Sequence, residues 1–211
     1  MNKKITLVIL LAIIGTIIFG FIEYFSYRTV AIEFIKPDLS ITIYNSTDNK
    51  ITSLDKNENI KVKEGSYYYI PTSDSFNSDK VYFLVTNNNS VVEINPAYSN
   101  TRLSTLLDKE GSKIHSSLTS KYPAIVGGYV IGDEKLYNHG DWYSARLIQR
   151  PQGTDEPDIY RVILKKDNNV WKVVVSPRLI ISVQDFPEIP TSYIKSVNEP
   201  LSSTAYSLLY L

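Results

Sequence analysis

Histidine, serine and cysteine carry out much of hydrolytic catalysis, and this 211-residue chain offers few of them in useful arrangements. It has no cysteine, which excludes disulfides, thiolate nucleophiles, iron–sulfur clusters and Cys-ligated zinc. No serine lies in the Gly-x-Ser-x-Gly turn of an activated nucleophile. The two histidines, His115 and His139, are too few for a His-rich metal site and are interpreted as solvated surface imidazoles. We therefore expect no catalytic residue, no cofactor and no metal ion.

Paired carboxylates are the second kind of group that could support catalysis, because two acids at a suitable separation hydrolyse glycosides. Such pairs occur at Asp133-Glu134 and Asp155-Glu156, with Asp158 shortly after. They fall in Gly- or Pro-containing segments typical of loops, where solvated charge is expected. The Asn- and Asp-rich stretch 45–59 lacks the ligand spacing of a calcium-binding loop, and no Gly-rich phosphate loop joins a strand to a helix.

The aromatic content has the greatest functional potential, since the chain contains 16 tyrosines. Tyr67, Tyr68 and Tyr69 are consecutive, and in a strand alternate side chains face opposite sides. If one face is buried, at least one of the three is exposed, and exposed tyrosine suits contact with proteins or glycans. These residues are the predicted interaction surface. The alternative is that tyrosine is frequent here because of its β-propensity.

The elements that position these residues begin with an apolar N-terminal segment. Residues 5–22 contain no charge and no proline, and a helix of that length spans roughly 27 Å, close to the thickness of a bilayer core. Lys3 and Lys4 favour a cytoplasmic N-terminus. We expect residues 1–28 to anchor the chain in plasma-membrane lipid, with residues after about 28 outside the cytoplasm. A cleaved signal peptide is the alternative, although no small-residue cleavage site follows.

Residues 29–96 are predicted to form a small antiparallel β-sandwich, because short alternating apolar and polar runs are separated by turn-forming residues. The runs at 32–34, 41–44 and 62–70 resemble the PEGA family, small β modules of bacterial envelope proteins. The resemblance implies a β module outside the cytoplasm.

From Tyr98 onward the periodicity changes. Apolar residues recur at three- and four-residue spacing from Leu103 to Leu118, which predicts an amphipathic helix ended by Tyr122-Pro123. Strand patterns follow at 124–131, 141–149, 158–166 and 170–176, and the last two are joined by a tight turn at Asn168-Asn169. Residues 97–200 are therefore predicted to be an α+β module with one long helix on an antiparallel sheet, closed by a short helix within 187–198. Residues 201–211 are a C-terminal tail.

The strand from Asp158 to Lys166 and the run from Trp171 to Pro177 resemble the ends of helix-plus-curved-sheet domains, loosely NTF2-like or cystatin-like, of bacterial membrane proteins. This resemblance implies a fold and no activity.

The net charge and the absence of catalytic motifs limit the classes of function that the chain could have. With 22 basic and 22 acidic residues the net charge is zero, which disfavours nucleic acid as a partner. In the absence of a catalytic motif we expect a non-enzymatic, single-pass envelope protein whose outer modules serve as a protein-interaction or scaffold unit, with another envelope protein as partner. The alternatives are a cell-wall or glycan-binding module and a hydrolase that uses carboxylates such as Asp133 or Asp158.

Overall fold

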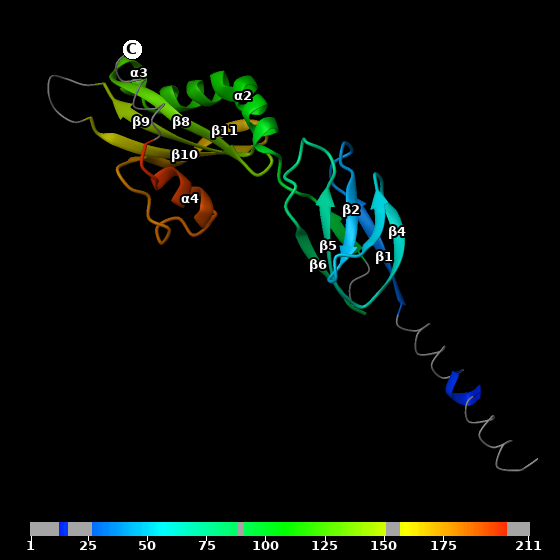
Figure 1. Cartoon of the computed structure of the whole chain (residues 1–211). Coiled ribbons are helices and arrows are strands. Elements are labelled where there is room, and N and C mark those ends of the chain that lie inside the picture. Colours follow the sequence, from blue (N-terminus) through cyan, green and yellow to red (C-terminus); the bar gives the residue numbers. More distant parts are fainter. Residues whose placement is uncertain (1–12, 17–26, 88–90, 151–156, 202–211) are drawn as a thin grey trace, which may run out of the picture. The chain divides into compact units, whose positions relative to one another are not determined.

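The computed structural model describes residues 13–16, 27–87, 91–150 and 157–201. The chain forms two compact units, Met1–Pro96 (unit 1) and Ala97–Leu211 (unit 2), coloured blue to green and green to red in Figure 1. Each unit has buried apolar residues of its own, so the two are described separately below.

The predicted transmembrane helix is wrong. Within the described residues, no helix is long and apolar enough to cross a membrane. Of the predicted span, residues 5–12 and 17–22 lie outside the described part of the chain, and residues 13–16 form a single helical turn. Hydropathy and length alone indicated the span.

From Tyr27 onward, the described part of unit 1 forms strands that are arranged in two sheets. The strands are β1 (Tyr27–Phe34), β2 (Ile41–Asn45), β3 (Lys50–Leu54), β4 (Glu58–Lys63), β5 (Gly65–Pro71), β6 (Val81–Val85) and β7 (Val91–Ile94). They are ordered β4-β1-β7 in one sheet and β3-β2-β5-β6 in the other. Alternate residues such as Val30 and Ile32 of β1 and Ile41 and Ile43 of β2 are fully buried, because each sheet turns one apolar face to the core.

The sequence predicted an antiparallel sandwich, but the sandwich also contains one parallel pair of strands. β1 pairs antiparallel with β4 on one side and parallel with β7 on the other, with Ile32 opposite Val92. A parallel pair needs a long connection between its strands, and here the connection contains all the other strands of the unit. Local alternation of apolar and polar residues carries no information about such a distant partner.

Unit 2 is an α+β fold. Its described elements are α2 (Asn100–Lys121), α3 (Ile125–Gly128), β8 (Tyr129–Tyr137), β9 (Trp142–Gln149), β10 (Ile159–Asp167), β11 (Val170–Arg178) and α4 (Thr191–Asn198). The sheet order is β11-β10-β9-β8, and each strand pairs antiparallel with the next. The predicted long helix is confirmed as α2: the Ser99 side chain caps it by accepting a hydrogen bond from the Arg102 amide at 3.3 Å, and it ends before Pro123.

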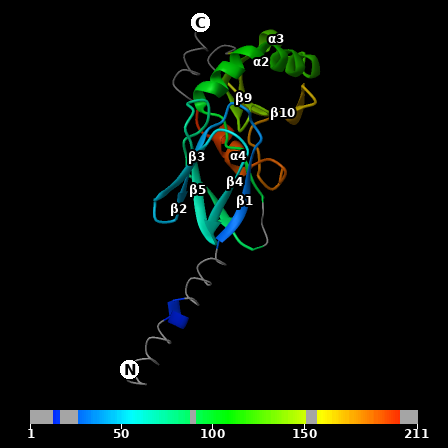
Figure 2. The same cartoon turned by 90° about the vertical axis from the view of Figure 1, so that its right-hand side faces the viewer.

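The two helices α2 and α4 lie on opposite faces of this sheet (Figure 1). On the α2 face, Ile114 and Leu118 pack with Tyr143 and Leu164 of the sheet. On the α4 face, Ile194 and Val197 pack with Trp142 and Ile163. Figure 2 shows α2 and α3 together above β9 and β10. Alternate residues of one strand therefore face different helices, which decides what each polar side chain can reach.

The strand predicted over residues 124–131 begins only at Tyr129. The chain after α2 first makes a turn, in which the amides of Ile125 and Val126 donate to the carbonyls of Tyr122 and Pro123. Gly127, which was predicted to lie within the strand, ends this turn with φ at +79°, a conformation that glycine adopts without strain.

Candidate functional site

A groove of about 540 Å³ lies in unit 2 between α2 and β8. Its apolar lining includes Leu103 and Leu107 of α2 and Leu136 of β8, and its polar lining includes Glu134 and Lys135. Ser196 of α4 lines it as well. Among the residues that the structure describes, β8 is an edge strand of the sheet, so within that part of the chain the groove borders main chain with a neighbouring strand on one side only.

A β-bulge in β8 decides which face of the sheet each of two adjacent carboxylates takes. The register of β8 with β9 shifts between Gly132 and Lys135, and the two residues between them are Asp133 and Glu134. Asp133 has φ at +48°, an uncommon conformation that aspartate tolerates better than most residues. Bulges of this kind re-aim side chains. Here Asp133 reaches the α4 face and Glu134 reaches the α2 face.

On the α2 face, Glu134 joins a helix to the sheet. One of its carboxylate oxygens accepts a hydrogen bond from the Tyr143 hydroxyl at 2.8 Å and lies 2.7 Å from Nε2 of His115. Tyr143 is fully buried, and this burial, together with the charge of Glu134, raises the pKa of its hydroxyl well above the usual value. His115 was interpreted as a solvated imidazole; its side chain is 41% exposed, and it also contacts Glu134, because the bulge turns that carboxylate toward α2.

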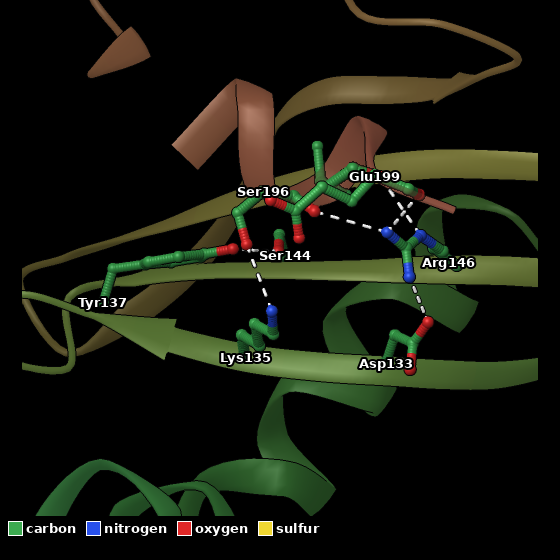
Figure 3. A network of polar contacts seen from close by, with 8 residues as sticks. Asp133, Lys135, Tyr137, Ser144, Arg146, Ser196 and Glu199 are labelled. Carbon is green, nitrogen blue, oxygen red and sulfur yellow. Dashed lines mark hydrogen bonds and ion pairs between the residues drawn. The ribbon is translucent and has the colours of Figure 1, made fainter. Parts of the chain in front are cut away.

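On the α4 face, Arg146 of β9 is buried and joins the sheet to the end of α4 (Figure 3). Its Nη1 is paired with the carboxylate of Asp133. Its Nε donates to the carbonyl of Val197 at 3.1 Å, and its Nη2 donates to the carbonyls of Ser196 at 3.3 Å and Glu199 at 2.5 Å. The last carbonyls of a helix have no partner within the helix, so this arginine both neutralises Asp133 and caps α4.

Two further pairs of polar side chains beside the groove contact each other. Lys135 Nζ donates to the Ser196 hydroxyl at 3.2 Å, and the hydroxyls of Tyr137 and Ser144 lie 2.8 Å apart (Figure 3). The ring of Tyr137 stacks on Tyr193 of α4 at 4.3 Å between centroids. Since Glu134 and Lys135 already have partners, the groove presents to a ligand mainly apolar side chains and the main chain of β8.

The predicted tyrosine surface is buried. The exposed fractions are small for all three residues, at 7%, 4% and 3% for Tyr67, Tyr68 and Tyr69. Tyr68 points away from the core as predicted for a strand, but β5 is an interior strand, and the flanking strands contribute Tyr44 and Tyr82, with ring centroids at 5.1 and 5.6 Å. Lys80 covers the ring from 4.3 Å. The expectation that at least one of these tyrosines is exposed was therefore wrong.

The exposed aromatic residue of this sheet lies on the neighbouring strand instead. Tyr82 and Leu84 of the edge strand β6 are 69% and 55% exposed. The sequence Val81–Val85 predicted a strand, but nothing in it distinguishes an edge strand from an interior one.

The other residues considered from the sequence are dispersed. Asp133 is held by Arg146, whereas Asp158 accepts a hydrogen bond from the exposed Tyr160 hydroxyl at 3.4 Å. Asp155 and Glu156 lie outside the described residues. His139 packs edge-on against Tyr98 at 5.3 Å between ring centroids. Among the residues that the structure describes, no three acidic or histidine side chains are grouped so as to hold a metal ion.

No protein-family model matches the chain, and neither a curated protein nor a solved structure matches it. The likenesses to PEGA and NTF2-like or cystatin-like domains therefore stay predictions.

Proposed function

We propose that the chain is a non-enzymatic protein-interaction unit, and that unit 2 binds an extended segment of a partner protein in the groove between α2 and β8. The observation that carries the proposal is that this groove borders an edge strand while its charged side chains are already paired within the unit. An edge strand recognises a partner through main-chain hydrogen bonds, a mode in which an extended peptide adds to the sheet.

The chain itself already uses this edge at one end. The amide of Tyr98 donates to the carbonyl of Asn138, just beyond β8, at 2.9 Å. Extended main chain therefore has a place beside the end of β8, and a partner segment would continue along the same edge. Leu103, Leu107 and Leu136 supply apolar contacts in the groove. Because side chains of a strand alternate, we expect the partner segment to carry apolar residues at every second position.

Two of the features that motivated the alternatives are occupied by contacts within the chain. A glycan-binding surface required exposed tyrosine faces, but the rings of Tyr44 and Tyr68 are stacked on each other with an angle of 12° between their planes. A hydrolase required carboxylates with room for substrate, but Asp133 is paired with the buried Arg146. An extended peptide would contact the apolar side chains of the groove and pair with the edge strand β8.

The test is to select binders from a displayed library of random twelve-residue peptides with the purified full chain, and to measure their affinity by fluorescence anisotropy. Ser104, an exposed residue of α2, lines the groove; Ser104→Trp would fill it without removing a core side chain. The matched control is Thr105→Trp, one position further on α2, at an exposed residue that does not line the groove.

We expect Ser104→Trp to weaken binding by about tenfold or more and Thr105→Trp to leave it unchanged. We also expect bound peptide to slow amide hydrogen exchange within Tyr129–Tyr137. Equal affinity for both variants, or protection confined to other strands, would rule out the groove.

A further inference from the structure

Three arginines stand side by side on the α4 face of unit 2. Arg161 of β10 is opposite Arg146 of β9 in one register and opposite Arg178 of β11 in the other. The contacts of Arg146 with the end of α4 place it on that face, and the guanidinium of Arg178 lies 4.7 Å from the ring of Phe186, which packs with the α4 cluster. Like charges directly opposite each other in a sheet are destabilising. Nearby negative charge would therefore stabilise this arginine row (Arg146, Arg161 and Arg178).

The carboxylates near the row do not balance it. Asp133 neutralises Arg146. Asp185 is 3.8 Å from Arg178, and both side chains of this pair are partly solvated, at 36% and 61% exposed, so the pair contributes little. Within the described residues Arg161 has no carboxylate partner, because its Nη1 donates to the main-chain carbonyls of Ile159 and Leu179.

The two outer arginines also have donors that are not used. In the described part of the chain, Nε of Arg161 and Nε of Arg178 are buried and have no hydrogen-bond acceptor. In a guanidinium group, neighbouring N–H groups form the fork that holds a carboxylate or phosphate through two parallel hydrogen bonds. Burial and the nearby charge of Arg146 lower the pKa of Arg161. A bound anion would offset both the missing hydrogen bonds and the repulsion.

We propose that the arginine row binds an oxyanion, a phosphate or carboxylate group, that Arg161 and Arg178 hold directly. Arg146 remains engaged with Asp133 and α4 and positions the row. This site lies on the α4 face and is independent of the groove proposed to bind a partner segment.

The experiment follows binding to the full chain by titration calorimetry and by the midpoint of thermal unfolding. Sodium phosphate and sodium succinate are the two probes, each compared with sodium chloride at the same ionic strength. We expect saturable binding of at least one probe, with a rise in the midpoint that chloride does not produce. Binding of phosphate alone or of succinate alone assigns the ligand class.

Two variants separate a site from general charge. Arg161→Gln is expected to weaken binding by about tenfold or more, the effect of losing a charge-assisted hydrogen bond. Lys172→Gln removes the same charge from an exposed pair with Asp167 at the far hairpin of the same sheet and should change nothing. If circular dichroism shows that Arg161→Gln is unfolded, Arg178→Gln takes its place. Absence of binding beyond that of chloride, or an equal response of the variant and the Lys172→Gln control, would overturn the proposal.

Discussion

A buried arginine is tolerated when its charge and its donors all have partners, and Arg146 meets this condition through one carboxylate and three carbonyls at the C-terminal end of α4. The same side chain thus pairs with Asp133 at the bulge of β8 and donates hydrogen bonds to the carbonyls at the end of α4. On the α2 face, Glu110 of α2 contacts Lys166 Nζ at 2.9 Å and Trp171 Nε1 at 3.1 Å in the sheet. Arg146 and Glu110 therefore each attach a helix to the sheet and can be tested one at a time.

Arg146→Met should lower the free energy of unfolding by about 3–5 kcal/mol, because it leaves the carboxylate of Asp133 unpaired and the last carbonyls of α4 without donors. Urea unfolding measures the loss. Lys172→Met, which breaks an exposed pair with Asp167 in the same unit, is the control and should cost less than about 1 kcal/mol. Adding Asp133→Asn to Arg146→Met should restore part of the loss; a loss below that of the control would contradict this account.

Glu110 makes the stability of unit 2 depend on pH. The hydrogen bond from Lys166 is the main cause that lowers its pKa from 4.5 to about 2, with further bonds from Trp171 and Lys113. Since the folded-state pKa is below that of the unfolded chain, the stabilisation is complete above about pH 4.5 and is lost as the pH falls toward 2. Glu110→Gln should remove up to about 3 kcal/mol at pH 7 and flatten the dependence of unfolding on pH between 4.5 and 2. An unchanged slope in that interval would argue against the pair.

Among the elements, those with local sequence signals could be predicted and those defined by distant partners could not. The leucine spacing and Pro123 predicted α2, and Asn168-Asn169 predicted the β10–β11 turn, where both residues have positive φ. The bulge at Asp133-Glu134 and the neighbours that cover Tyr68 depend on which strands pair. No residue within β8 or β5 encodes that choice, so the burial of the tyrosines and the contact between Glu134 and His115 could not be predicted.

The β10–β11 turn offers a test at this scale. Asn168 and Asn169 have φ at +48° and +63°, the conformation of a two-residue hairpin turn that favours glycine. Asn169→Gly should be neutral or stabilise unit 2 by up to about 1 kcal/mol, whereas Asn169→Val should cost about 1–2 kcal/mol, because a β-branched residue is strained at positive φ. Thermal unfolding of the two variants gives the difference. If both variants were equally stable, the turn would not have this conformation.

In the whole molecule, each unit has its own buried core. We therefore expect two unfolding transitions rather than one. Tyr68→Ala removes a buried ring from unit 1 and should lower one midpoint, at a cost of about 3 kcal/mol, whereas Arg146→Met should lower only the other. Urea titration followed by hydrogen exchange distinguishes the two. A single transition that both variants shift would mean that the units unfold together.

The parallel pairing of β1 with β7 bears on how the chain is made. β1 is the middle strand of its sheet, but β7, on one side of it, is the last strand of unit 1 to leave the ribosome. Unit 1 therefore has contacts of long sequence separation and should fold more slowly than the sheet of unit 2, in which successive strands pair. Val30 and Ile32 are fully buried in the folded unit, but during synthesis they stay exposed until β7 has been made and can pair with β1. That interval makes β1 the stretch of the nascent chain at greatest risk of aggregation and the first that a chaperone would need to cover.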